Sequence, residues 1–258
     1  MKHSVLKQYE KAIQEDIVFR YATEKDDLQN KENGFIFSDP YYRFIRTIEL
    51  IKKSELKIEK NETWVDLGCH YGELLNLVDN SFACNFVGID DWNLKEALPA
   101  TGFNYFAANL ADKEWPGQLL HKNVRVVSAT EVIEHMIDTD QFLRSISSTF
   151  SLGSGYLILT TPNINSLRNR VLVPFGVYPA SMEYRNIIHH VRLFNVSALK
   201  ELLESNGFEI LHCIGVSFFP ERFLKINFIR IISEKLANIF PTLCGNIIVI
   251  AKCKKTDD

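Results

Sequence analysis

The sequence predicts an α/β protein whose doubly wound, mostly parallel sheet carries helices on both faces. Three observations predict this fold. Short apolar runs alternate with helix-periodic stretches from residue 63 onward. The first of these runs leads into a glycine-bearing turn, as in sheets that bind a ligand at the carboxyl ends of their strands. The length of 258 residues suits one large domain better than two small ones.

Composition limits the partners and the compartment that we expect. The chain is 46% hydrophobic and 24% charged, with a net charge of -3, which is typical of a globular protein and gives no reason to expect general nucleic-acid binding. The five cysteines form no CxxC pair, so we expect reduced thiols in a cytoplasmic protein. No apolar run approaches the roughly 18 residues that span a bilayer, and the polar start of the chain lacks the apolar core of a signal peptide.

The N-terminal part is predicted to be a helical cap. Residues 1–58 are expected to form a cap or lid that packs on a domain of residues 59–258. Residues 1–40 are charged and weakly patterned. Residues 41–53 place Phe44, Ile48 and Ile51 at helical spacing, which predicts an amphipathic helix.

Strands and helices are then expected in alternation. The expected strands are Thr63–Leu67, Phe86–Ile89, Tyr105–Ala107, Val124–Ser128, Tyr156–Thr160, Phe208–Val216 and Asn246–Ala251. The expected helices are Glu73–Val78, Phe142–Phe150, Val196–Asn206 and Phe223–Phe240. Residues 163–188 interrupt the alternation, and we interpret them as an insertion that recognises substrate.

Residues 64–74, WVDLGCHYGEL, combine a strand, an acid, a turn and the start of a helix. A nucleotide-like ligand at the strand ends needs backbone that it can approach closely, and Gly68 and Gly72 supply it. Asp66 is placed to accept hydrogen bonds from a cationic amine. The alternative is a tight turn without a ligand. A nicotinamide site is disfavoured, because glycines at 68 and 72 do not fit GxGxxG.

Residues 86–91, FVGIDD, form the second element of the cofactor site. Asp90 ends the second strand about 20 residues after the glycine turn, a spacing that places a carboxylate beside ribose hydroxyls. The alternative is an acid that caps the next turn. Together with the glycine turn, we favour the ribose role.

Six motifs, in order, carry a resemblance to a known family. They are VDLGCHYG (65–72), VGIDD (87–91), EVIEHM (131–136), TTPN (160–163), HHVRLF (189–194) and LKELLESNGFEI (199–210). The chain resembles class I S-adenosylmethionine-dependent methyltransferases, especially ubiquinone-biosynthesis O-methyltransferases and methyltransferases of polysaccharide gene clusters. The resemblance implies a Rossmann-like, seven-stranded sheet whose last strand is antiparallel, with S-adenosylmethionine as cofactor. It also implies an enzyme that methylates a small molecule, and we expect a hydroxyl of a sugar or glycoconjugate.

The resemblance implies a cofactor site as well. Its expected members are Asp66, Gly68, Cys69, His70, Gly72, Asp90, Asp91, Trp92, Asn109, Leu110 and Thr130. Two of them depart from the family pattern. His70 replaces a glycine, so its side chain either narrows the cofactor slot or reaches into the active site. Asn109 replaces an aspartate that accepts from the adenine amino group, a bond that its amide oxygen can still make.

Glu131, Glu134 and His135 are the candidate catalytic residues next to that site. If a helix begins at Thr130, the three share one face. A structural interpretation is a capping box between Ser128 and Glu131.

Two functional interpretations of this face stay open. The acids and His135 can bind a divalent cation with His190 as a fourth ligand, as in small-RNA 3′-end methyltransferases. Alternatively a histidine acts as base or substrate orienter without a metal, with His190 ranked first, then His135 and His70. We favour the metal-free interpretation by a small margin.

The insertion and one later segment are expected to meet substrate or partners. The expected substrate residues are Arg168, Tyr178, Tyr184, Arg185 and Arg192, with solvated loop residues as the alternative. The arginines suit phosphate or carboxylate, and the tyrosines suit stacking on a ring. Residues 218–240 are expected to include a core helix, the alternatives being a surface for a lipid-linked substrate or for a homodimer partner.

Two other functions stay open beside sugar O-methylation. One is a metal-dependent RNA 3′-end 2′-O-methyltransferase, although the chain has no basic stripe. The other is a binding module that has lost catalysis, which the departures at His70 and Asn109 allow.

Overall fold

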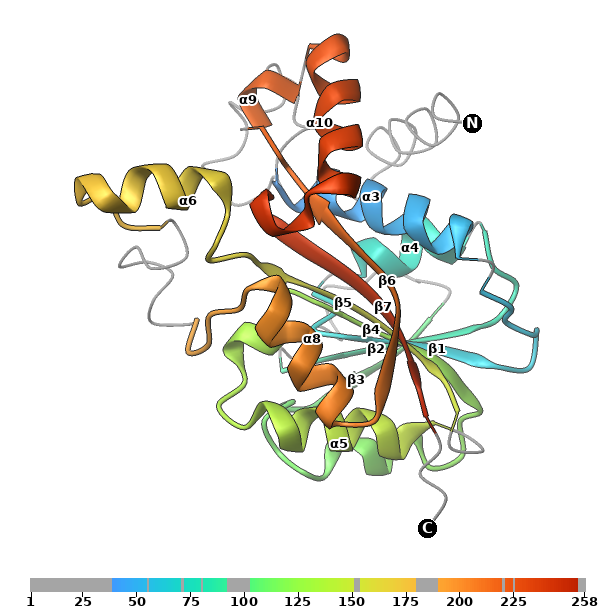
Figure 1. Ribbon diagram of the computed structural model, residues 1–258. Coiled ribbons are helices and arrows are strands. Elements are labelled where there is room, and N and C mark those ends of the chain that lie inside the picture. Colours follow the sequence, from blue (N-terminus) through green and yellow to red (C-terminus); the bar gives the residue numbers. More distant parts are fainter. Residues whose placement is uncertain are drawn as a thin grey trace, which may run out of the picture.

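A seven-stranded sheet forms the centre of the computed structural model, which describes residues 39–54, 56–70, 72–79, 81–91, 103–150, 154–179, 190–219, 221–224 and 226–254. The strand order is β3-β2-β1-β4-β5-β7-β6 (Figure 1). The strands are β1 (Thr63–Leu67), β2 (Asn85–Asp90), β3 (Asn104–Ala107), β4 (Val124–Thr130), β5 (Tyr156–Pro162), β6 (Phe208–Val216) and β7 (Asn246–Cys253). β7 runs antiparallel to both of its neighbours, and the other pairs are parallel. The predicted fold is therefore confirmed.

Helices cover both faces of this sheet. The α-helices of the described residues are α3 (Asp39–Lys53), α4 (Glu73–Asp79), α5 (Thr139–Thr149), α6 (Leu167–Leu172), α8 (Val196–Ser205), α9 (Glu221–Leu224) and α10 (Asn227–Ile239). Short 3-10 helices are η4 (Trp115–Leu119), η5 (Ile133–His135), η7 (Val173–Phe175) and η9 (Pro241–Leu243). Figure 1 shows α3 and α4 on one face, and α5 and α8 on the other.

The alternation of side chains along the strands divides the core in two. Trp64 of β1 and Ile158 of β5 pack with Ile48 and other side chains of α3 and α4. Val65 and Leu157, one residue away on the same strands, pack in the cluster that α5 and α8 complete. A parallel sheet needs both faces covered, which explains its continuous apolar runs.

Two helix predictions need correction. The stretch predicted as one helix over Phe223–Phe240 is two helices, α9 and α10. No α-helix begins at Thr130, because β4 ends there and only the 3-10 helix η5 follows before α5. Residues 1–38 of the expected cap and 180–188 of the expected insertion lie outside the described residues. In the described part of the chain, no helix is both long and apolar enough to cross a bilayer.

Candidate active site

The turn after β1 requires its two glycines. Gly68 has φ +65°, and a β-carbon there would lie 2.6 Å from Cγ2 of Val132. Gly72 has φ +78°, and a β-carbon there would lie 2.3 Å from the ring of Phe103. Both positions therefore combine a left-handed backbone with a neighbour too close for a side chain. The turn is held to the second strand by the amide of Gly68, which donates to the carbonyl of Ile89 at 2.8 Å.

His70 occupies the left-handed region between these glycines. Its φ is +47°, which costs on the order of 1–3 kcal/mol for a residue other than glycine. Its amide donates to Oδ2 of Asp90 at 2.8 Å, and its ring Nδ1 lies 3.0 Å from Oε1 of Glu73. The backbone at His70 thus keeps the conformation that suits glycine, while the side chain joins an acid at the start of α4.

Asp66 is fully buried beneath this turn. Ser128 Oγ donates to Asp66 Oδ1 at 2.6 Å and itself accepts from the indole of Trp64 at 2.9 Å. Burial raises the pKa of Asp66 to about 7, the charges of Glu73 and Asp90 add to this rise, and the Ser128 hydrogen bond opposes it. An amine or ammonium group of a ligand that contacts Asp66 would favour its ionised form.

A cavity of about 140 Å³ opens at this turn. Its lining residues are Arg43, Phe44, Asp66, Gly68, Cys69, His70, Glu73, Leu74 and Thr130. Five predicted cofactor residues therefore share one cavity. The thiol of Cys69 is buried, which raises its pKa and leaves it a lining group rather than a nucleophile.

Sequence reasoning missed four residues of this cavity, Arg43, Phe44, Glu73 and Leu74, and Arg43 is the one that brings a positive charge. It comes from α3, and its Nη1 lies 3.4 Å from Oε2 of Glu131. No motif marks this arginine, because a single cation on an amphipathic helix normally faces solvent. The sole hint is its position directly before Phe44, on the helix face that the core covers.

The predicted adenine side is partly described. Asp90 Oδ1 accepts from the amide of Asp91 at 2.8 Å, so this carboxylate orients the turn after β2. Asn109 Oδ1 accepts from the amide of Ala111 at 3.0 Å, and Leu110 lies in the core beneath it. Trp92 lies outside the described residues.

Glu131 and Glu134 do not share a helix face, because no α-helix begins at Thr130. The expected capping box between Ser128 and Glu131 is wrong for the same reason. Ser128 is buried inside β4, and Glu131 has a left-handed φ of +56°. Glu131 Oε1 accepts from the hydroxyl of Thr160 at 2.9 Å, whereas Glu134 Oε2 accepts from Thr161 at 3.0 Å. Successive residues of a strand point to opposite faces, so β5 directs the two acids to different sides of the sheet.

Glu134 instead meets the two predicted histidines. The rings of His135 and His190 lie 4.9 Å apart at 71°, and one ligand atom from each of Glu134, His135 and His190 lies within 4.8 Å of the others. Glu134 is buried, and its Oε1 has no hydrogen-bond partner among the described residues. Burial raises the pKa of Glu134 well above its ordinary value, and the charge of Glu131 adds to this rise. The structure therefore brings together three of the four predicted catalytic residues.

The predicted substrate residues are dispersed. The guanidinium of Arg192 donates to the carbonyl of Ile137, while its amide donates to the carbonyl of Glu134 at 3.0 Å, so its substrate role stays a prediction. Arg168 is exposed on α6, and Tyr178 is exposed beyond η7. Tyr184 and Arg185 lie outside the described residues.

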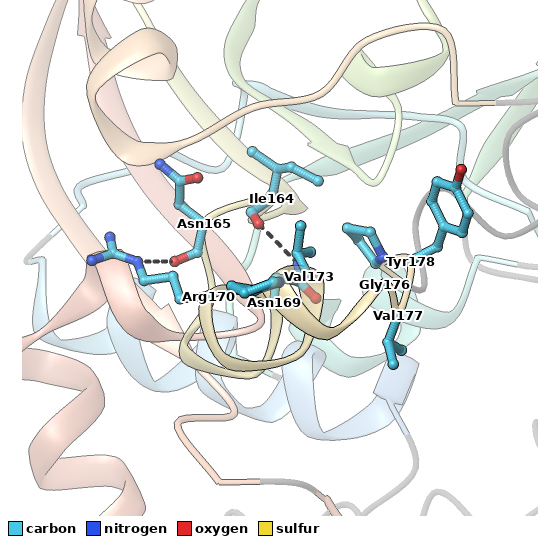
Figure 2. A pocket seen from close by; sticks show the side chains of 10 residues that line it. Ile164, Asn165, Asn169, Arg170, Val173, Gly176, Val177 and Tyr178 are labelled. Carbon is cyan, nitrogen blue, oxygen red and sulfur yellow. Dashed lines mark hydrogen bonds between the residues drawn. The ribbon is translucent and has the colours of Figure 1, made fainter.

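A second, open cavity of about 650 Å³ lies beside Tyr178. Figure 2 shows the side chains that line it, all from residues 164–179. Within this lining, Arg170 Nε donates to the carbonyl of Asn165 at 2.7 Å and Asn169 donates to the carbonyl of Ile164 at 2.9 Å. The described part of the expected insertion thus forms a concave surface with amide, guanidinium and phenol groups.

Comparisons with known proteins bear on the family and on the fold. Residues 41–213 match a family model described as a methyltransferase domain. The mitochondrial ubiquinone biosynthesis O-methyltransferase of Homo sapiens is 26% identical over 163 residues, which cover 60% of this chain and 44% of that protein. The chain therefore spans less than half the length of this relative.

Solved structures show the same fold. A SAM dependent methyltransferase from Archaeoglobus fulgidus has a TM-score of 0.51 at 20% identity, covering 81% of this chain and 92% of that one. An S-adenosylmethionine dependent methyltransferase from Mesorhizobium loti has a TM-score of 0.52 at 17% identity, covering 79% of this chain and 96% of that one. At such identities these similarities concern the fold alone.

Proposed function

The chain belongs to the methyltransferase-domain family, whose model matches residues 41–213, and we propose that it transfers a methyl group from S-adenosylmethionine to a hydroxyl of a small molecule. We propose a sugar or glycoconjugate of polysaccharide biosynthesis as the acceptor. The observation that carries the proposal is the cavity at the glycine turn, where the Asp66 carboxyl and the Arg43 guanidinium line one space.

The charges of this cavity match the methionine end of the cofactor. S-adenosylmethionine carries an ammonium and a carboxylate on one carbon, and Asp66 and Arg43 offer the complementary charges. Charge-assisted hydrogen bonds of this kind are roughly twice as strong as neutral ones. Asp90, at the end of β2, is the proposed acceptor from the ribose hydroxyls, because it already contacts the turn through the amide of His70.

Methyl transfer needs alignment and removal of one proton. The acceptor oxygen attacks the methyl carbon in line with the carbon–sulfur bond, whose electron pair goes to sulfur as S-adenosylhomocysteine leaves. In the metal-free interpretation, the hydroxyl proton passes to His190, with His135 as the alternative base, since both rings lie at one site. An unperturbed imidazole pKa near 6.5 suits this step.

The residues around Glu134 also fit a divalent cation. Two imidazoles and a buried carboxylate with a free oxygen form a mixed donor set typical of such sites. Glu134, His135 and His190 would hold the ion, which would supply positive charge that favours an ionised acceptor hydroxyl. This geometry changes our preference from the metal-free interpretation to a cation site at these three residues.

The RNA-end alternative is less well supported. It rests on a quartet that includes Glu131, and Glu131 is engaged by Thr160 and Arg43. For the sugar acceptor, support comes from the second cavity, because Asn165, Asn169 and Tyr178 are side chains that bind hydroxyls or stack on a ring. All five cysteines are free thiols, which supports our proposal of a cytoplasmic location.

Calorimetry with the cofactor tests this proposal. We expect S-adenosylmethionine and S-adenosylhomocysteine to bind with micromolar dissociation constants, roughly 7–8 kcal/mol of binding free energy. NAD serves as the control nucleotide. A heat of binding with NAD, and none with S-adenosylmethionine or S-adenosylhomocysteine, would refute the assignment of the glycine turn as the cofactor site.

Variants of two cofactor residues are expected to weaken binding. Asp90→Ala removes a charged acceptor from the ribose, and Arg43→Ala removes the cation from the cavity. Each change should lower cofactor affinity by about 1–3 kcal/mol, the usual value for a hydrogen bond to a charged group. Titration of each variant measures this loss, and wild-type affinity in both would place the cofactor elsewhere.

Cofactor affinity should also depend on pH through Asp66. The pKa of Asp66 is about 7 without ligand, while the cationic amine binds best to the ionised carboxylate. Affinity should therefore fall by about tenfold per pH unit as the pH drops below 6, and level off above 7. Asp66→Asn should bind more weakly and lose this slope. A slope that persists in the variant would assign the proton to another group.

A further inference from the structure

Helix α10 presents its apolar side chains outward. Phe228 is 71% exposed and Ile239 is 66% exposed, and Ile231 lies between them on the same side. The buried residues of this helix are Ser233, Glu234 and Ala237. The helix therefore buries small and polar residues, half-buries Ile229, Ile232 and Leu236, and leaves one apolar side exposed. The predicted core helix therefore covers β6, but one of its apolar sides stays exposed.

Specific polar contacts hold α10 in this orientation. Arg46 of α3 donates from Nη2 to Oδ1 of Asn238 at 2.9 Å. Ser233 Oγ accepts from the amide of Phe219 at 3.3 Å. Ser233 on the buried side and Asn238 at its border both have polar partners, and the apolar side with Phe228 faces away from the protein.

A second apolar segment projects from the same edge of the sheet. Val171 on α6 and Val173 on η7 are exposed, Val177 is exposed just beyond η7, and Phe175 is 82% exposed. Helix α6 follows β5 and α9 follows β6, two strands that run in the same direction (Figure 1). The cofactor turn follows β1 at that edge too. We call residues 167–178 and 226–240 the apolar end.

The charges of the apolar end are basic. Residues 163–179 contain Arg168 and Arg170 and no acid. On helix α10 the exposed cation is Lys235, whereas Arg230 lies on the same side as the buried Ser233, Glu234 and Ala237. This combination occurs in a chain whose net charge is -3. Apolar side chains interspersed with cations are suited to the interface of an anionic bilayer.

We propose that the apolar end docks on an anionic lipid surface. The two apolar segments can each insert into the interface of a bilayer independently, so they need not form one continuous surface. The docked orientation places the edge of the sheet that carries the cofactor turn toward the lipid headgroups. The proposal does not depend on the identity of the methyl acceptor.

Vesicle sedimentation tests the proposal with the full chain. Wild type should bind vesicles of phosphatidylcholine and phosphatidylglycerol more tightly than vesicles of phosphatidylcholine alone. Phe175→Ser with Phe228→Ser should lower partitioning by at least about 100-fold, because each phenylalanine contributes roughly tenfold or more. The matched control is Leu120→Ser. Leu120 is 79% exposed and precedes β4 at the opposite edge of the sheet, so this change should leave partitioning unaltered.

The charge contribution is measured separately. Arg168→Gln with Lys235→Gln should weaken binding to the anionic vesicles by about 25-fold and leave phosphatidylcholine binding unchanged, since each cation contributes roughly fivefold. Calorimetry with S-adenosylhomocysteine should give wild-type affinity in every variant, which separates this test from the proposed function.

Two outcomes would overturn the proposal. One is wild type that sediments with neither vesicle. The other is a wild-type dimer that Phe228→Ser converts to monomers with vesicle binding unaltered, which would assign the apolar end to a second copy of the chain.

Discussion

Glu134→Gln or His190→Ala is expected to lower turnover by about 10²–10⁴-fold, the usual range for loss of a group that handles the transferred proton. Cofactor affinity should remain at the wild-type value, because the proposed cofactor cavity is lined by other residues. The glutamine keeps the size of Glu134 and its contact with Thr161, so the loss reports on charge rather than packing. Steady-state kinetics and calorimetry on the same preparations measure both quantities.

A chelator distinguishes the two roles of this group. If Glu134, His135 and His190 bind a cation, chelation should abolish turnover, spare cofactor affinity and be reversed by added divalent metal. His121→Ala is the matched control, because His121 is an exposed histidine outside the candidate site. Turnover that survives chelation but falls in His190→Ala would assign a base without a metal. Full activity in the Glu134 and His190 variants would remove these residues from the mechanism.

Gly72→Ala is expected to destabilise the fold by about 2–5 kcal/mol. The left-handed backbone costs a side chain about 1–2 kcal/mol, and the clash with Phe103 adds about 1–3 kcal/mol of overpacking. Denaturant unfolding measures the loss, and cofactor affinity should fall with it because the turn lines the cavity.

Two further variants separate the causes. Gly117→Ala is the matched control, since Gly117 has nothing within 4 Å of an added β-carbon and no positive φ. Adding Phe103→Ala to Gly72→Ala relieves the clash and leaves the backbone cost. If Gly72→Ala were as stable as Gly117→Ala, the geometry of this turn would be wrong.

Local sequence patterns were sufficient for most of the fold. Each predicted strand was recovered with its ends within two residues, because an apolar run between turns is a local property. The glycine turn and Asp90 were likewise found from residues close in sequence. The left-handed conformation at His70 shows why glycine is the usual residue at that position.

Local sequence patterns could not predict the contacts between segments that are distant in the chain. Whether Glu131 and Glu134 share a side depends on Thr160 and Thr161 of β5, whose side chains point to opposite faces. A helical pattern could not include the partner strand, so the expected capping box was wrong. Arg43 was missed for a similar reason, since the cavity it lines is formed by residues of later strands.

The sequence by itself determined the order of strands and helices, the glycine turn and the acids that follow β1 and β2, because these depend on backbone preferences and on the spacing of apolar residues. The tertiary structure decided which of those residues meet. In the folded chain His190 lies beside His135, Glu131 pairs with Arg43, and the apolar side of α10 is exposed. These outcomes depend on which surfaces compete for burial, and hydrophobic spacing along one helix cannot specify its partner.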